Sequence, residues 1–154
     1  MSAPLRFRHA REEDLSAIVA LISDDGLGRK REISSEQPAP EYSQAFAEIA
    51  KDPNQLMTVA ELDGNVIGYL QITFIPGLSR RGAWRGQLES VRIASHLRGQ
   101  GHGVQFLRWA IDQCRMRGCA LVQLTTDRQR HDALRFYEKL GFVYSHCGMK
   151  LPLP

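Results

Sequence analysis

Three glycines within residues 99–103 separate a run that is predicted to be a strand from a run that is predicted to be a helix. Residues 87–93 form the predicted strand, and apolar residues recur at helical spacing over residues 104–114. A strand that passes through a turn into a helix is typical of a sheet covered by helices. This feature therefore predicts a mixed α/β fold, with the turn as the first place to look for a ligand site.

The glycine turn has the properties of an anion site. At a helix N-terminus the first backbone N–H groups have no partner within the helix, and the helix dipole favours a negative charge there. Glycine lets the backbone come close to a diphosphate, and Arg98 adds a cation at the rim. The spacing matches neither the P-loop nor the dinucleotide fingerprint. A glycine-rich turn without a ligand is the alternative.

Strand and helix patterns follow one another along the chain in the order βααβββαβαβ. Glycine and proline mark loops at 26–40 and 76–86, and Asp63-Gly64-Asn65 marks a hairpin turn. A length of 154 residues fits one hydrophobic core, so we expect a single domain over residues 1–154. The predicted strands are 5–9, 56–62, 66–75, 87–93, 120–125 and 142–151, and the predicted helices include 15–22, 42–49, 104–114 and 132–140.

Composition narrows the class of protein. No apolar run approaches the roughly 20 residues that a membrane helix needs, and the N-terminus lacks the apolar stretch of a secretory signal. We therefore expect a cytoplasmic protein without a membrane partner. The three cysteines form no CxxC pair, which predicts reduced thiols that mostly fill the core, and no metal site. A nucleophilic cysteine is the alternative.

Basic charge is concentrated in the middle of the chain. Residues 80–130 contain ten arginines and no lysine against three acidic residues, whereas acidic residues outnumber basic ones elsewhere. Such a region indicates a polyanionic partner, either a nucleotide cofactor or nucleic acid. The sequence lacks the signatures of RRM, KH and helix-turn-helix modules, which disfavours nucleic acid. A solvated arginine-rich face is the alternative.

Two sequence blocks resemble the GCN5-related N-acetyltransferase (GNAT) family. Arg98-Gly99-Gln100-Gly101-His102-Gly103 matches the family's R/Q-x-x-G-x-G/A motif, and residues 132–142 are similar to its late A-x-x-F/L-Y-x-x-x-G-F block. One helix and one strand separate the two blocks, and the element order resembles the family along nearly the whole chain. The run 130–137, with Ser145-His146, is also similar to the aminoalkylphosphonate acetyltransferase branch.

The resemblance implies a fold class and a cosubstrate. It predicts an α/β (α+β) fold, in which a mixed, mostly antiparallel central sheet splays between strands 89–93 and 120–125 and is flanked by helices. The pantetheine arm of acetyl-CoA would lie in this gap, and its diphosphate would lie on the glycine turn. Many family members have Asn where this chain has Arg130, so Arg130 is predicted to reach a phosphate instead. The residues predicted to bind acetyl-CoA are Val91, Arg92, Ile93, Arg98, Gly99, Gln100, Gly101, His102, Gly103, Val104 and Arg130.

Acetyl transfer to an amine needs a base for the amine, a donor for the developing oxyanion and an acid for the leaving thiolate. Glu89 is the candidate base, because several family members have an acid two residues before the position of Val91; it would act directly or through a water. The alternative is a strand carboxylate paired with Arg92 or Arg85. The oxyanion donor is expected to be a backbone N–H near Val91 or Arg92.

Tyr137 is the candidate acid. It matches the tyrosine of the family's late helix, and a phenol with a pKa of about 10 is protonated at neutral pH. The alternative is that Tyr137 packs in the core like its neighbour Phe136.

The acceptor is only weakly encoded. We expect its site to include Phe74, Trp84, Arg85 and His146. Trp84 and Arg85 belong to the predicted loop at 76–86. A metal bound by His131 and His146 is the alternative to core or surface histidines, and we expect no metal.

The sequence therefore predicts an acetyl-CoA-dependent N-acetyltransferase of a small amine, with a homodimer left open. Short loops favour a small acceptor over a protein or peptide, which is the first alternative. A coenzyme A-binding regulator without catalysis is the second, and the presence of both Glu89 and Tyr137 disfavours it.

Overall fold

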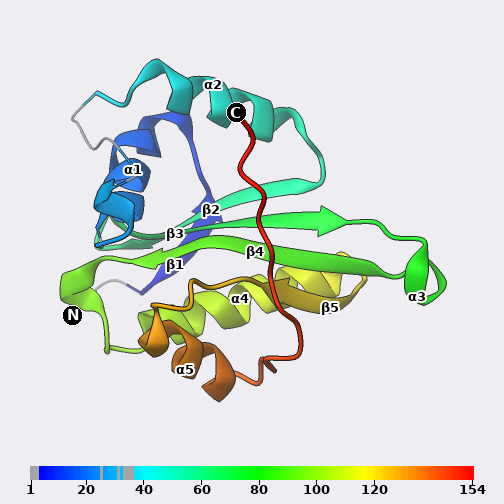
Figure 1. The fold of residues 1–154 in the computed structure, drawn as a ribbon. Coiled ribbons are helices and arrows are strands. Elements are labelled where there is room, and N and C mark those ends of the chain that lie inside the picture. Colours follow the sequence, from blue (N-terminus) through cyan, green and yellow to red (C-terminus); the bar gives the residue numbers. More distant parts are fainter. Residues whose placement is uncertain (1–3, 25, 31, 33–36) are drawn as a thin grey trace.

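The structure, a computed structural model, describes residues 4–24, 26–30, 32 and 37–154. Within these residues, a five-stranded sheet runs in the order β1-β2-β3-β4-β5 (Figure 1). Neighbours from β1 to β4 pair antiparallel, and β4 and β5 pair parallel. This mixed, mostly antiparallel sheet confirms the predicted fold class. The strands are β1 (Arg6–His9), β2 (Gln55–Leu62), β3 (Asn65–Ile75), β4 (Trp84–Ile93) and β5 (Cys119–Leu124).

Helices cover both faces of the sheet. α1 and α2 lie on one face, and α4 and α5 lie on the opposite face (Figure 1). The four predicted helices are confirmed; of the predicted 26–40 loop, residues 31 and 33–36 lie outside the described part of the chain. The helices are α1 (Leu15–Ser23), α2 (Pro40–Lys51), the one-turn α3 (Ser79–Gly82), α4 (His102–Met116) and α5 (His131–Lys139), with 3-10 turns at Glu12–Asp14, Gly28–Lys30 and Ser95–Leu97.

Strand alternation sends side chains into two hydrophobic clusters, one on each face of the sheet. Leu70, Ile72 and Leu88 belong to the cluster that contains the buried residues of α4. Val59 and Tyr69 belong to the cluster that contains buried residues of α1. Neighbouring residues on one strand therefore serve different faces, and this alternation decides which side of the sheet each functional side chain reaches.

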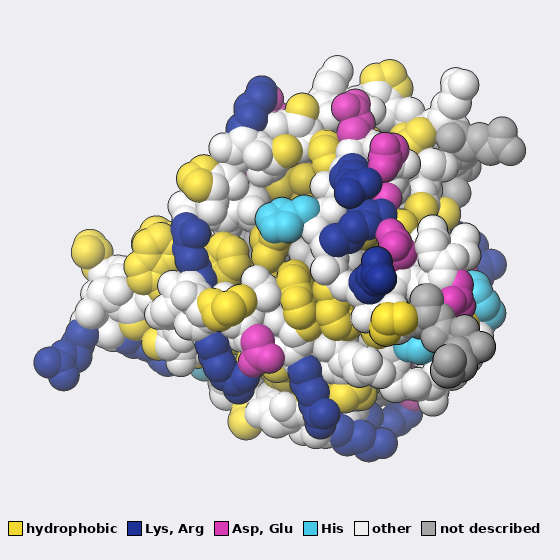
Figure 2. Space-filling model, turned by 180° about the vertical axis from the view of Figure 1, so that it is seen from behind, with side chains coloured by type: hydrophobic (Ala, Val, Ile, Leu, Met, Phe, Trp, Pro, Cys, Tyr) yellow, Lys and Arg dark blue, Asp and Glu magenta, His cyan; other side chains and the backbone are white. Residues whose placement is uncertain are grey.

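The β3–β4 hairpin extends beyond the body of the molecule. Figure 2 shows it as an arm with Lys and Arg side chains at its tip. α3 closes the arm, and Arg80 and Arg81 there adopt left-handed φ angles of 55° and 61°. β4 begins at Trp84, three residues before the predicted strand, so the loop predicted at 76–86 is shorter and Trp84 and Arg85 are strand residues.

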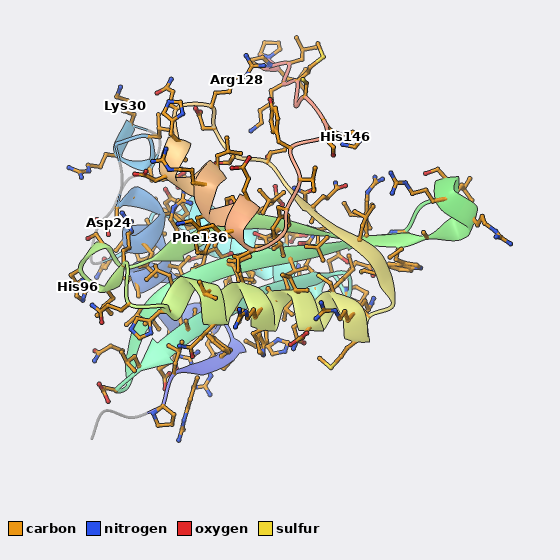
Figure 3. All side chains as sticks on the ribbon, turned by 90° about the horizontal axis from the view of Figure 1, so that it is seen from below. Asp24, Lys30, His96, Arg128, Phe136 and His146 are labelled. Carbon is orange, nitrogen blue, oxygen red and sulfur yellow. The ribbon has the colours of Figure 1, made fainter. Side chains whose placement is uncertain are left out.

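The predicted last strand at 142–151 is wrong. No strand is assigned after α5, and the described residues 143–154 are exposed throughout. Figures 1 and 3 show this C-terminal tail crossing the β5 edge of the sheet instead of running along it. A segment in this direction forms no ladder with β5, so its strand-like alternation finds no partner within the described residues.

The cysteines differ in burial. Cys114 is buried in the α4 cluster, Cys119 is partly buried and Cys147 is exposed, and all three are free thiols. The prediction that the thiols mostly fill the core is therefore confirmed, because Cys114 belongs to the α4 cluster and Cys119 packs against it, and Cys147 is the exception. No helix in the described residues is both long and apolar enough to cross a membrane.

Candidate functional site

A gap opens between β4 and β5 halfway along β4. The two strands pair from Trp84 to Leu88, and the last pair joins Leu88 to Leu124. Residues 89–93 of β4 continue beside β3 but have no partner on β5. The splay predicted between 89–93 and 120–125 is therefore confirmed, and it leaves one edge of β4 without a neighbouring strand beyond Leu88.

A β-bulge lies at the start of this free edge. The β3–β4 register passes from Gln71↔Glu89 to Tyr69↔Arg92, so two residues of β4 oppose one residue of β3. Ser90 there has a φ of 52°, which is uncommon for a residue with a side chain. Bulges bend a strand and redirect its polar groups, and they are frequent beside functional sites. This bulge separates the exposed Glu89 from the backbone of Val91.

The backbone groups of Val91 and Ile93 point into the gap. Ala94 donates its N–H to Ile67 O of β3 at 2.8 Å, and alternate residues of a strand present their N–H and C=O groups to opposite edges. The carbonyls at the gap accept bonds from arginines of this chain: Arg92 Nη1 lies 2.9 Å from Val91 O, and Arg98 Nε lies 3.0 Å from Ile93 O. Both arginines thus border the gap.

The glycine turn leads from the gap into α4. Gly101 is the N-cap of α4, with a left-handed φ of 87° and no side-chain hydrogen bond to the first turn. The first N–H groups of the helix therefore have no cap from the N-cap residue, which suits a diphosphate. A Cβ at Gly99 or Gly101 would meet nothing within 4 Å, so their left-handed backbone, rather than crowding, requires glycine.

Gly103 has a different role from the other two glycines of the turn. A Cβ there would lie 3.4 Å from Cζ of Phe136 and 3.7 Å from Cγ1 of Ile93. Gly103 therefore lets α5 approach the start of α4, as Figure 3 indicates by the position of Phe136 above α4. Within the turn, Gln100 is exposed and donates to His96 O at 3.3 Å, and His102 and Val104 are half-buried.

The two candidate catalytic residues lie on opposite faces of the sheet. Glu89 pairs in register with Gln71 and is exposed on the face of α1 and α2, whereas Tyr137 packs with the cluster on the face of α4. Burial raises the pKa of Tyr137 above its usual value of 10.0, although the charges of Arg92 and Arg130 act in the opposite direction. Tyr137 is therefore a protonated donor at neutral pH.

A row of polar side chains lies beside Glu89 on the face of α1 and α2. Gln71 Nε2 and Thr73 Oγ1 both donate to Gln55 Oε1, at 3.0 and 2.9 Å. Gln123 Nε2 donates to Gln87 Oε1 at 2.7 Å, which carries the row across β4 and β5. We name Gln55, Gln71, Thr73, Gln87 and Gln123 the polar row. The sequence prediction missed it, although polar residues at alternate strand positions were the signal that would have found it.

Tyr69 stands at the end of the polar row that is nearer the bulge. Its hydroxyl donates to Gln71 Oε1 at 3.4 Å, and the residue is buried. Burial and, to a smaller extent, the charge of Glu89 raise the pKa of Tyr69. The charge of Glu89 acts on the phenol, so the two groups lie near one another on this face of the sheet, which sequence reasoning also missed.

The residues predicted to bind the acceptor do not form one group. Phe74 and Trp84 lie on the α4 face at the base of the hairpin arm, where the Arg117 guanidinium lies over both rings at 5.1 and 5.6 Å. Arg85 lies on the other face, in line with Gln87 and Glu89, and its Nε is buried without a hydrogen-bond partner among the described residues. His146 is exposed on the tail, with Nδ1 2.7 Å from Ser145 Oγ.

A depression of about 350 Å³ lies between the segment after α1 and the loop before α5. Gly26, Leu27 and Lys30 line it from the segment after α1, and Gln129 and Arg130 line it from the loop before α5. Figure 3 labels Lys30 and Arg128 at this end of the molecule. Lys30 and Arg130 make the opening basic. Among the described residues, no group of three or more His, Cys, Asp or Glu side chains lies close enough to hold a metal ion.

The comparison with protein families agrees with this geometry. The model of the acetyltransferase (GNAT) family matches residues 10–142. The chain belongs to the GNAT family. As a GNAT protein it is an acyltransferase that uses acetyl-CoA as cosubstrate. The sequence predicted the edge of β4 beyond Leu88 for the pantetheine arm and the glycine turn for the diphosphate, and both assignments stay predictions.

Several proteins resemble this GNAT chain along most of its length. It is 31% identical to an aminoalkylphosphonate N-acetyltransferase of Salmonella typhimurium, over 90% of this chain and 85% of that protein. A crystal structure from Bacillus halodurans, named a transcriptional regulator, is 48% identical with a TM-score of 0.94 and covers 97% of this chain and 100% of its own. A predicted acetyltransferase of Clostridium acetobutylicum with acetyl-CoA shares the fold at 18% identity, with a TM-score of 0.73 and coverage of 97% and 96%.

Proposed function

We propose that this GNAT chain transfers the acetyl group of acetyl-CoA to the primary amine of a small molecule by direct attack, with Glu89 as base and Tyr137 as acid. The observation that carries the proposal is that Glu89 follows directly after the last β4–β5 pair on the face of α1, whereas Tyr137 packs on the face of α4, where the charge of Arg92 from β4 acts on it. An amine that approaches from the face of α1 would meet Glu89 first, and a thiolate that leaves toward α5 would meet Tyr137.

Each side chain has one task in the proposed reaction. Acetyl-CoA supplies the acetyl group as a thioester. Glu89 takes a proton from the amine, directly or through a water, so that the nitrogen lone pair can attack the carbonyl carbon. A backbone N–H near Val91 or Arg92 donates to the oxygen on which negative charge develops. Tyr137 then gives its proton to the departing sulfur as the carbon–sulfur bond breaks, the product nitrogen loses its second proton to water, and water restores the proton of Tyr137.

The arginines around Tyr137 support the last step. The charges of Arg92 and Arg130 act on the phenol, so both lie near enough to influence the developing thiolate. A positive charge in a partly buried site stabilises an anion more strongly than it would in water. We propose that Arg130 also contributes to binding a phosphate of coenzyme A, because it lines the basic opening with Gln129.

A small acceptor is supported by two observations. The polar row offers amide and hydroxyl groups on the acceptor face, and such groups suit a small hydrophilic molecule. The Salmonella protein that is 31% identical is named for an aminoalkylphosphonate, which is a small amine. A protein or peptide acceptor remains the alternative within the family.

A second candidate function is regulation, in which the binding of acetyl-CoA is itself the signal. The observation that favours it is the name of the Bacillus halodurans structure, a transcriptional regulator 48% identical to this chain. The two candidates differ in turnover. A regulator of this kind would bind acetyl-CoA and release no free coenzyme A thiol with any amine, whereas the transferase would release it with at least one.

The first experiment measures the melting temperature with acetyl-CoA, with ATP and short DNA as controls, and then thiol release with a panel of small amines. Binding to the native state alone raises the melting temperature by mass action. We expect a rise that is specific to acetyl-CoA, followed by turnover with a small hydrophilic amine. An equal rise with every polyanion, or none with millimolar acetyl-CoA, would contradict the proposal.

Two substitutions test the roles of the side chains. Tyr137→Phe is expected to lower kcat by about 100-fold with little change in acetyl-CoA affinity, because it removes only the proton donor. Glu89→Gln is expected to lower the rate most at the acid end of the pH–rate profile, where the unprotonated amine is scarce. Glu48→Gln serves as the control, since it removes an exposed carboxylate of α2 that pairs with Lys51 and that has no part in the proposed reaction. An unchanged kcat in Tyr137→Phe would remove Tyr137 as the acid.

A further inference from the structure

We infer that Asp24, at the end of α1, is a positioning residue for the coenzyme A site, an inference that rests on the proposed function. Asp24 lies outside both blocks that carry the family resemblance, and it is about 70 residues away in the sequence from the turn that it contacts. Figure 3 shows it next to His96, at the end of the molecule where the chain passes from β4 toward α4. Its contacts hold that passage to α1.

Asp24 makes three contacts with the segment that leads into the glycine turn. Its Oδ2 accepts the backbone N–H of Ser95 at 3.0 Å. Its backbone carbonyl accepts a bond from Arg98 Nη2 at 3.3 Å, and the same nitrogen lies 3.8 Å from Oδ2. Because Arg98 Nε also donates to Ile93 O, this one arginine joins the end of β4, the glycine turn and the end of α1.

The contact with Ser95 supplies a helix cap from a distant residue. Ser95 is the first residue of the 3-10 turn Ser95–Leu97, and its N-cap residue is Ala94, whose side chain has no acceptor. Helical turns need such an acceptor for their first N–H groups. Asp24 therefore provides the cap that Ala94 lacks, and it fixes the direction in which the chain enters the turn at 98–101.

The geometry also changes the role of Arg98. The sequence predicted a cation at the rim of a diphosphate site, whereas the Arg98 guanidinium is turned back toward Ile93 O and Asp24. A carboxylate at this place would repel a diphosphate by its charge alone. Its presence is understandable if its hydrogen bonds, rather than its charge, serve the ligand by holding the turn in its binding shape.

The two roles of the carboxylate predict opposite results, which makes the test sharp. Isothermal titration measures the Kd of coenzyme A for the wild type, Asp24→Ala and Asp24→Asn. If Asp24 positions the turn, Asp24→Ala weakens binding about tenfold, and Asp24→Asn, which keeps an oxygen for the Ser95 N–H, restores binding to within about threefold of the wild type. If Asp24 acts only by repulsion, both variants bind more tightly, and the inference is overturned.

Asp112→Asn is the matched control, because Asp112 also pairs with an arginine, Arg115, but on the exposed side of α4. Its Kd is expected to equal that of the wild type. Should Asp24→Ala fail to fold, Asp24→Glu keeps the charge and moves the carboxylate by one methylene, and a several-fold loss of affinity is then expected. An affinity of Asp24→Ala or of Asp24→Glu equal to that of the wild type would overturn the inference.

Amide hydrogen exchange provides a second measurement that a purely structural role would not affect. In the wild type, coenzyme A is expected to slow exchange at the C-terminal end of α1, because the turn and Asp24 are joined; in Asp24→Ala this effect of the ligand is expected to disappear. If coenzyme A still slows exchange there in Asp24→Ala, the inference about Asp24 is overturned, whereas the proposed function is not. A wild type that binds no coenzyme A would overturn the proposed function and, with it, this inference.

Discussion

At the scale of the residue, the Asp14 carboxylate accepts hydrogen bonds from two residues, Arg8 and Arg11. It is buried where the 3-10 turn meets α1, and Arg8 of β1 binds both of its oxygens, at 2.7 and 3.0 Å. The backbone N–H of Arg11 donates to the same carboxylate at 2.7 Å. Arg8 also donates from Nε to Oε2 of Glu61 at 2.8 Å. These contacts tie the first strand to the first helix.

Asp14→Asn is expected to lower the free energy of unfolding by about 3 kcal/mol, because it leaves the guanidinium of a partly buried pair without its carboxylate. The hydrogen bonds from Arg8 hold the pKa of Asp14 below its usual value. A carboxylate with a lowered folded pKa stabilises the protein above its unfolded pKa and loses this contribution as the pH falls. The difference between wild type and variant, measured by urea unfolding, should therefore shrink below about pH 4.

The control for this substitution is Asp132→Asn, which removes an exposed carboxylate that pairs with Arg135 on α5. An exposed pair contributes about 0.5 kcal/mol or less. A loss in Asp14→Asn no larger than in this control would mean that the Arg8–Asp14 pair does not stabilise the fold. A difference that stays constant from pH 7 to pH 3 would contradict the direction of the pKa shift.

At the scale of the element, the contact between β4 and α4 depends on one missing side chain. A Cβ on Gly86 would lie 2.3 Å from Sγ and 3.2 Å from Cβ of Cys114, which is buried on α4. Gly86 therefore allows the strand and the helix to come closer than any larger residue would. The close approach occurs just before the point where β4 leaves β5, so the packing that sets the start of the gap passes through it.

Gly86→Ala is expected to destabilise the protein by about 2 kcal/mol, because the thiol must move within a filled core. Cys114→Ala in the same chain should recover part of this loss, because it removes the nearest atom and leaves the 3.2 Å contact. Urea unfolding of the wild type, the two single variants and the double variant measures the coupling. Gly26→Ala is the control, since a Cβ there meets nothing within 4 Å. Additive effects of the two substitutions would contradict the close contact.

The sequence predicted where helices and strands occur better than it predicted which strands pair with one another. Periodicity and turn residues identified the four main helices and the first five strands, because these patterns depend on local burial. The strand predicted at 142–151 failed because a strand also needs a neighbouring edge, and alternation alone does not say whether the segment runs along β5 or across it. Trp84 was assigned to a loop because the glycines around it resemble turn residues, although Gly86 serves packing.

The candidate site was predictable where it depends on the backbone and less so where it depends on contacts between distant segments. The glycine turn and the gap followed from the family motifs, since these record local backbone geometry. The bulge at Ser90 left no local signal, because a left-handed φ at serine comes from pairing with β3. Asp24 and the polar row were missed for the same reason: their partners lie on other elements.

At the scale of the whole molecule, the two faces of the sheet hold different parts of the candidate site. The face of α4 and α5 holds the larger cluster and the start of the glycine turn, and the face of α1 and α2 holds Glu89 and the polar row. The gap between β4 and β5 is the place where groups on the two faces can act on one bond. A ligand that spans this gap therefore contacts both halves of the structure, and we expect it to stabilise the molecule as a whole.

The tail after α5 lies outside this arrangement. Met149, Leu151 and Leu153 are 95%, 84% and 83% exposed, so these apolar side chains contribute little to the core. Removal of residues 148–154 is expected to change the melting temperature by less than about 3 °C, which corresponds to about 1 kcal/mol in a chain of this size. The affinity for coenzyme A should not change.

A sixth strand along β5 would give the opposite result, because truncation would then expose a sheet edge and remove buried apolar area. The melting temperature would fall by well over 5 °C, and Leu151→Ser in the full-length chain would reproduce part of the fall. In the structure described here the same substitution falls on an exposed side chain, and it should leave the stability within about 0.5 kcal/mol of the wild type. If the truncation and Leu151→Ser both leave the stability nearly unchanged, the tail lies outside the sheet. If both lower the melting temperature, the tail forms a sixth strand.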